Sequence, residues 1–120
     1  MHTRKQGDIS EKLVLNYFLK LGYKFVAKNW YCRYGELDLV LVDCLQKSKK
    51  LVFVEVKSCV SFVENPAELV TYLKLIKLKK TMFEFIFKYR ILNSWRLDVA
   101  AVSLQKYTDN IKIYSNIFAY

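Results

Sequence analysis

Histidine, glycine, proline and cysteine are all scarce in this chain of 120 residues. The single histidine, His2, lies beside the N-terminus, which argues against histidine-based catalysis. Three cysteines, Cys32, Cys44 and Cys59, are odd in number and widely spaced, so they form neither a disulfide scaffold nor a zinc-binding CxxC pair. With one proline and three glycines, we expect these residues to mark specific turns and helix ends.

Long apolar runs are missing too. No stretch reaches the roughly 18 apolar residues that cross a bilayer, and the first residues hold no apolar run of the kind found in secretion signals. We therefore expect a soluble, cytoplasmic protein with reduced thiols and no membrane partner. A hydrophobic content of 53% excludes a disordered chain. The length predicts one domain over residues 1–120, too short for a (β/α)₈ barrel of about 250 residues.

Positive charge dominates the chain, with 20 Lys and Arg against 11 Asp and Glu and a formal net charge of +9. The basic residues gather in segments 1–34 and 74–96, whereas the rest of the chain is slightly acidic. A basic surface indicates an anionic partner. An acidic centre within it favours a metal-dependent enzyme that acts on a polyanion, because carboxylates hold the cation and basic side chains hold phosphates.

The apolar pattern predicts an α/β domain in the order α-β-β-β-α-β-β. The first helix covers 8–21, with a capping box at Asp8 and Glu11 and a helix-ending glycine at Gly22. The second helix covers 65–89 and begins at Asn65 and Pro66. Apolar runs predict five strands, at residues 23–31, 37–42, 51–57, 95–104 and 111–118. We expect a mixed β-sheet flanked by helices, because the second helix can return the fourth strand parallel to the third.

Three acids lie where apolar residues are expected. Asp38 and Glu55 interrupt apolar runs typical of strands buried on both faces, and such burial costs several kcal/mol, roughly, unless the charge is paired. Lys57 shares a strand face with Glu55, and the helical pattern turns Glu11 toward the sheet. We predict that these four side chains form one site. A structural alternative stays open, in which Glu55 and Lys57 form an ion pair, Asp38 holds a turn and Glu11 caps a helix.

Such a cluster suits phosphodiester hydrolysis. Two or three carboxylates can hold Mg²⁺ (or Mn²⁺), which activates water and stabilises the leaving oxygen. A neighbouring lysine can orient the water or neutralise charge on phosphorus.

The motifs also resemble a known family. Asp38, followed after sixteen residues by Glu55-Val56-Lys57, is similar to the PD-(D/E)XK nuclease signature. A longer ordered series is similar to the YraN-like family of uncharacterised bacterial proteins and extends to about Val102. The series comprises Gly7-Asp8-Ile9-Ser10-Glu11, Leu21-Gly22-Tyr23, Asn29-Trp30, Arg33-Tyr34-Gly35-Glu36-Leu37-Asp38-Leu39, Phe53-Val54-Glu55-Val56-Lys57-Ser58, Val70-Thr71 with Lys74, and Arg96-Leu97-Asp98-Val99.

This resemblance implies a restriction-endonuclease-like fold, related to archaeal Holliday-junction resolvases, and a metal-dependent endonuclease that cuts DNA, with branched DNA among the candidate substrates. By motif position, the resemblance makes Glu11, Asp38 and Glu55 the metal acids and Lys57 the catalytic lysine. The chain departs from the family pattern at Ser10, Cys59 and Lys77, where glycine, a basic residue and arginine are usual.

Other polar and aromatic residues allow two interpretations each. The residues Lys74, Lys77, Thr81, Glu84 and Lys88 form a helical polar stripe, either solvated or in contact with phosphates. Arg33 is predicted to contact nucleic acid together with Lys74, Lys77 and Lys88. The aromatic residues that flank it, Trp30, Tyr31 and Tyr34, are expected to pack rather than to stack on bases. Asp98 is expected to pair with Arg96.

Two further functions stay open besides the enzyme. One is a non-catalytic nucleic-acid-binding module with the same fold, and the other is a protein-interaction domain whose basic surface serves solubility. The sequence also leaves a homodimer open.

Overall fold

The computed structural model describes residues 4–105 and 109–119 of the chain. Its elements, in chain order, are α1 (Arg4–Lys20), β1 (Lys24–Cys32), β2 (Gly35–Asp43), β3 (Lys50–Cys59), the 3₁₀ turn η1 (Pro66–Glu68), α2 (Tyr72–Lys88), β4 (Trp95–Leu104), β5 (Asp109–Tyr114) and the 3₁₀ turn η2 (Ile117–Ala119). The predicted order of helices and strands is confirmed. Neither helix in this part of the chain is long and apolar enough to cross a bilayer.

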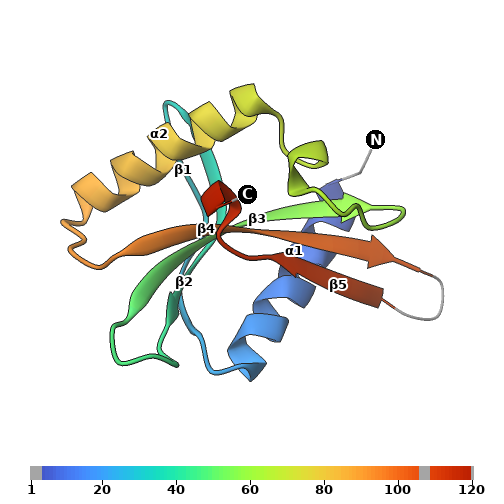
Figure 1. Ribbon diagram of the computed structural model, residues 1–120, viewed down its shortest axis with the longest axis horizontal. Coiled ribbons are helices and arrows are strands. Elements are labelled where there is room, and N and C mark those ends of the chain that lie inside the picture. The colour runs from blue at the N-terminus through green and yellow to red at the C-terminus, as the bar shows by residue number, and fades with distance from the viewer. Residues whose placement is uncertain (1–3, 106–108, 120) are drawn as a thin grey trace.

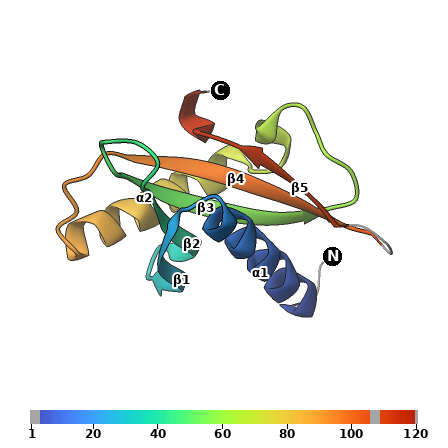
Figure 2. The same ribbon diagram turned by 90° about the horizontal axis from the view of Figure 1, so that it is seen from below.

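The strands form one mixed sheet in the order β1-β2-β3-β4-β5. Strands β1, β2 and β3 form an antiparallel meander, β4 lies parallel to β3, and β5 returns antiparallel to β4. As predicted, α2 is the crossover between the parallel pair. The two helices cover opposite faces of the sheet (Figure 1 and Figure 2), and the domain is therefore a helix–sheet–helix sandwich.

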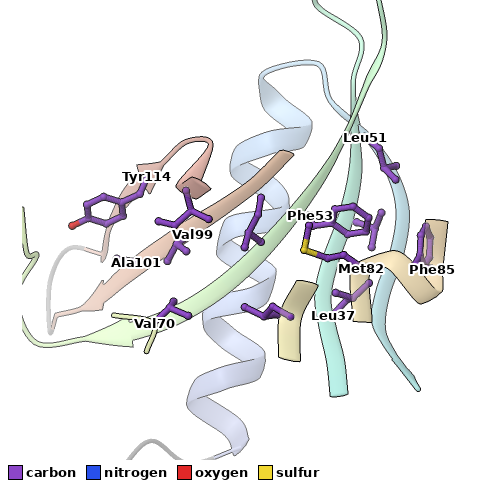
Figure 3. Packing of buried hydrophobic residues seen from close by; sticks show 13 residues of the cluster. Leu37, Leu51, Phe53, Val70, Met82, Phe85, Val99, Ala101 and Tyr114 are labelled. Carbon is purple, nitrogen blue, oxygen red and sulfur yellow. The ribbon is translucent and has the colours of Figure 1, made fainter. Parts of the chain in front are cut away.

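Each face of the sheet has its own core. On the α2 face, Met82 and Phe85 of the helix pack over Leu37, Phe53 and Val99 of the strands (Figure 3). The α1 face buries another set, made of Val14, Phe18, Leu39, Leu41, Val52, Val54, Ala100 and Val102. Strands β2, β3 and β4 therefore contribute apolar residues to both sides, which is why their sequences read as nearly continuous apolar runs.

The end of α1 matches its prediction, but the start does not. Gly22 has φ +97°, its N–H donates to Leu19 O (3.0 Å), and the N–H of Tyr23 donates to Phe18 O (3.1 Å). These two bonds form a Schellman motif that ends the helix. The predicted capping box at Asp8 is wrong, because the helix already begins at Arg4 and Asp8 lies inside it.

The second helix is shorter than predicted. Asn65 caps only the single turn η1, where its side chain accepts from the N–H of Ala67. The chain then leaves helical geometry, Val70 enters the core, and α2 begins after Thr71, whose hydroxyl accepts from the N–H of Lys74 (3.2 Å). Burial of Val70 is the tertiary contact that separates the two helical segments.

Candidate active site

The candidate site lies where β2 and β3 part. Their pairing ends at Leu39↔Val54, although both strands continue beyond this point. Asp38 is the residue of β2 next to Leu39 on the unpaired side. Its Oδ2 accepts a hydrogen bond from the N–H of Val56 at 2.8 Å. The carboxylate thus takes the place of a strand-to-strand hydrogen bond at the opening between β2 and β3. It gives the Val56 N–H a partner that this donor would otherwise lack.

The neighbouring strands β1 and β2 both change face at this point. Residues two apart in a regular strand share a face, yet Leu37 packs on the α2 side and Leu39 on the α1 side. In β1 the neighbouring Asn29 has φ +51°, and the pairing passes from Lys28↔Leu39 to Trp30↔Leu37. The irregularity directs Asp38 toward the opening instead of into either core.

Glu55 approaches Asp38 from the α2 side. It lies two residues after Phe53 and is 5% exposed. Burial first, and then a hydrogen bond with Asp38 and the charge of Asp38, raise the pKa of Glu55 to about 9. The raised pKa favours the protonated form of Glu55 at neutral pH.

One oxygen of Glu55 remains available. Its Oε2 is buried and has no hydrogen-bond partner anywhere in residues 4–105 and 109–119. Lys74 Nζ lies 3.8 Å away, which is too long for a hydrogen bond. Because its raised pKa favours the protonated form of Glu55, the contact between Lys74 and Glu55 is a weak attraction and not a formed ion pair.

Lys57 extends the site along β3. It lies on the same face as Glu55 and is half-buried, and its charge lowers the pKa of Glu55 more weakly than burial raises it. Among the described residues, Lys57 has no ion-pair partner. Its ammonium group is therefore free to meet an anion.

Glu11 approaches from the α1 side. Burial, and next the charge of Asp38, raise the pKa of Glu11 to about 7. The neighbouring Ser10 hydroxyl is hydrogen-bonded to the Ser58 hydroxyl at 2.7 Å, which ties this turn of α1 to β3. With its amide nitrogen turned to the acids, Asn29 donates to Glu11 Oε1 (3.0 Å) and to Glu36 Oε1 (3.1 Å).

An open cleft of about 610 Å³ contains Glu11 and Asp38, whereas Glu55 and Lys57 are not among its described lining residues. Its lining residues are Gly7, Asp8, Glu11, Asn29, Tyr31, Glu36 and Asp38. Sequence reasoning did not select Asn29 or Glu36 for the site. The sequence signal for these two residues was their position inside the motif segments. Asn29 directly precedes Trp30, and Glu36 lies two residues before Asp38.

The acids offer oxygen ligands of the kind that Mg²⁺ or Mn²⁺ prefers. Within the described ranges, no three Asp, Glu, His or Cys side chains already form a metal-binding group. The close pair is Asp38 with Glu55, and Glu11 faces Asp38 from α1. Because Mg²⁺ keeps several waters and needs few carboxylates, the pair and the unpartnered Oε2 of Glu55 fit such a cation.

The basic residues predicted to contact nucleic acid have different neighbours. Lys74 reaches the site, and Lys77 lines a cavity of about 200 Å³ beside Glu36. Lys88 lies over the ring of Trp30, 6.0 Å from its centroid. Arg33 lies 3.6 Å from Glu84.

The predicted polar stripe is interrupted in its middle. Thr81 is buried, and its hydroxyl donates to Lys77 O at 2.8 Å. The prediction of a polar stripe is therefore wrong at Thr81, because a threonine hydroxyl that is hydrogen-bonded to its own helix backbone does not need to contact solvent.

Two structural predictions are confirmed. Trp30 packs on Phe85, with ring centroids 5.2 Å apart. Arg96 Nε donates to Asp98 Oδ1 at 3.0 Å, and the same guanidinium also bonds Asp43 and Tyr23. Tyr31 differs from its prediction, because it is 75% exposed rather than packed.

Comparisons with known proteins give one family. Residues 10–102 match the model described as Uncharacterised protein family UPF0102, the YraN-like family that the motifs resemble. A UPF0102 protein of Legionella pneumophila (strain Philadelphia 1) is 32% identical over 118 residues, covering 97% of this chain and 96% of its own length. A Clostridium botulinum (strain Kyoto) relative is 32% identical over 117 residues, with 93% and 92% covered. A Fervidobacterium nodosum relative is 32% identical over 118 residues, with 96% and 83% covered.

Proposed function

The chain belongs to the UPF0102 family, and we propose that it is a metal-dependent endonuclease that hydrolyses phosphodiester bonds in DNA. In this proposal the α/β domain is a restriction-endonuclease-like fold of the PD-(D/E)XK superfamily, and branched DNA is one candidate substrate. The single observation that carries the proposal is the pairing of Asp38 with the buried Glu55, whose Oε2 lies without a hydrogen-bond partner in the described residues at the opening between β2 and β3.

Asp38 and Glu55 would hold Mg²⁺ or Mn²⁺, with Glu11 as the third acid. A bound divalent cation supplies an activated water and stabilises negative charge on the leaving oxygen. Asp38 is oriented in advance, because Val56 N–H holds one of its oxygens. Asn29 orients Glu11 in the same way from the cleft side.

Lys57 would act on the phosphate. It is half-buried, close enough to Glu55 to lower that acid's pKa, and has no acid as an ion-pair partner in the described part of the chain. A fixed positive charge beside the scissile phosphate favours the transition state, in which negative charge increases. Lys74 brings a second positive charge to the same side of the sheet.

A cleavage screen tests the proposal. Labelled single-stranded, duplex and four-way-junction DNA is incubated with Mg²⁺ or Mn²⁺ and the wild type, Asp38→Asn or Glu64→Gln. We expect the wild type to cut at least one substrate, Asp38→Asn to lose this activity and Glu64→Gln, an exposed control, to keep it. Equal cleavage by Asp38→Asn would overturn the site, and DNA binding without cleavage of any substrate would favour the non-catalytic binding module.

A further inference from the structure

Tyr31 is an exposed aromatic residue at the proposed site. It is 75% exposed, and it lines the cleft that also contains Glu11 and Asp38. Among the described residues that line this cleft, it is the one aromatic residue. The neighbouring rings are occupied, because Trp30 packs on Phe85 and Arg33 lies over Tyr34. Within residues 4–105 and 109–119, the Tyr31 ring has no aromatic, cationic or hydrogen-bond partner.

The backbone holds Tyr31 toward the cleft. Trp30 packs on the α2 side of the sheet, so Tyr31, the next residue, projects to the opposite face. Ladder pairing of Tyr31 with Glu36 and of Cys32 with Gly35 fixes this end of β1. The ring is thus presented beside Glu36, which lines the same cleft. Because β1 is an edge strand of the sheet (Figure 1), no further strand in the described part of the chain pairs with its outer side.

The charge of the cleft decides which part of a nucleic acid this edge can contact. Four carboxylates line the cleft, from Asp8, Glu11, Glu36 and Asp38. They repel phosphates except where a cation intervenes. A nucleobase carries no charge, and stacking on a tyrosine ring needs none.

We propose that Tyr31 is a stacking platform for an unpaired nucleobase next to the scissile phosphate. The substrate would then be DNA with single-stranded nucleotides at the cut, such as a flap, a junction or a single strand. A base inside a duplex is stacked on its neighbours, so it has to leave the stack before it can reach the ring. This inference rests on the proposed nuclease function.

The test is equilibrium binding in CaCl₂, because Ca²⁺ takes the oxygen ligands of an acidic site and so relieves the repulsion between the acids and the phosphates. The DNA is checked to be uncut after each titration. A short labelled single-stranded DNA and its duplex are titrated with the wild type, Tyr31→Ala, Tyr31→Phe and Tyr72→Ala. Tyr72 is an equally exposed tyrosine on α2 that does not line the cleft. Base–aromatic stacking of this kind changes affinity by about fivefold or more. We expect Tyr31→Ala to bind single-stranded DNA about fivefold or more weakly than the wild type does and to bind the duplex equally well. Tyr31→Phe and Tyr72→Ala should bind both DNAs like the wild type.

An abasic scan supplies a readout that a structural role would not change. Single-stranded DNAs that each lack one base are compared, and we expect one position to weaken binding of the wild type but not of Tyr31→Ala. Equal affinities of the wild type and Tyr31→Ala, or equal losses on single strands and duplex, would overturn the inference. Cleavage that depends on Asp38 would then still support the nuclease. Conversely, a Tyr31 effect without cleavage in the screen would overturn the nuclease and leave a single-strand-binding edge.

Discussion

At the scale of single residues, Glu55 links protonation to stability. Its pKa of about 9 in the folded protein exceeds the ordinary value of 4.5, because the acid is buried beside Asp38. Between these values the folded state binds more protons than the unfolded state, so the free energy of unfolding falls as pH rises. Glu11, with a pKa of about 7, adds to this slope only below that pH.

Glu55→Gln should therefore stabilise the cation-free protein. The amide keeps the shape of the acid and removes its charge, and one unit of pKa shift corresponds to about 1.4 kcal/mol. At a pH of about 8 we expect a gain of at least about 1 kcal/mol in the free energy of unfolding, and a flatter pH dependence above about pH 7. Denaturant unfolding in EDTA at several pH values measures both, with Glu64→Gln as the exposed control. A slope identical to that of the wild type would contradict the buried-acid assignment.

Lys57 separates catalysis from binding. Lys57→Ala removes one fixed charge from beside Glu55, and loss of one such electrostatic partner costs about 10²–10³ in rate. DNA affinity should change much less, because the chain has 20 Lys and Arg residues to share phosphate contacts. Matched cleavage rates and binding constants are compared with those of Lys47→Ala, an exposed control in the β2–β3 connection. A mutant that cuts as fast as the wild type would show that the lysine assignment is wrong.

At the scale of elements, α2 presents its basic residues in more than one environment. Lys77 lies near Glu36, and Lys88 lies over Trp30, so both are directed to the side of α2 that faces β1 and β2. The double change of Lys77 and Lys88 to Ala should weaken DNA binding. On duplex DNA it should also reduce the slope of log affinity against log salt, by up to about 0.9 for each phosphate that the variant no longer neutralises. The matched control is the double change of Lys47 and Lys49 to Ala, and an equal effect of both pairs would reduce α2 to a solvated surface.

The local sequence pattern predicted the presence of the helices and strands better than the residues at which they begin and end. Apolar runs were sufficient for the presence of five strands and the mixed sheet, because strands buried on both faces leave few other patterns. The last strand was predicted to reach residue 118, but β5 ends at Tyr114 and the 3₁₀ turn η2 follows. The start of α2 was wrong, since Asn65 and Pro66 begin a helical turn whether or not it continues, and burial of Val70 ends it. Local signals of capping carry no information on such a tertiary contact.

The same division applies to the candidate site. Asp38 and Glu55 could be selected because a charge inside an apolar run is costly. The apolar pattern did not place Asn29, Tyr31 and Glu36 in the cleft, because they reach it through the change of face in β1 and β2. That irregularity depends on pairing between strands, and a period-two pattern assumes that it is absent.

At the scale of the whole molecule, Arg96 joins segments that lie far apart in sequence. Its guanidinium bonds Asp98 of β4, Asp43 of β2 and the Tyr23 hydroxyl before β1. Asp98 also accepts from Asn116 N–H at 2.8 Å, which ties in the C-terminal segment. Arg96→Met would leave two buried carboxylates without their cation. We expect a loss of about 3–5 kcal/mol in the free energy of unfolding by denaturant, against little change for Arg33→Met, whose pair with Glu84 is exposed.

The proposed cation should stabilise the whole fold, because its acids come from α1, β2 and β3. A ligand that binds only the folded state at ten times its Kd adds about 1.4 kcal/mol, which raises Tm by roughly 5–6 °C in a domain of this size. We expect such a rise for the wild type when MgCl₂ or MnCl₂ is added at constant ionic strength. Asp38→Asn should show no rise, because it lacks a ligand for the cation. Its starting Tm can differ from that of the wild type, because removal of one acid also relieves repulsion with Glu55. Glu64→Gln should respond like the wild type. An equal rise in Asp38→Asn would mean that the cation binds elsewhere on the molecule, and the Asp38–Glu55 pair would then be a structural carboxyl pair.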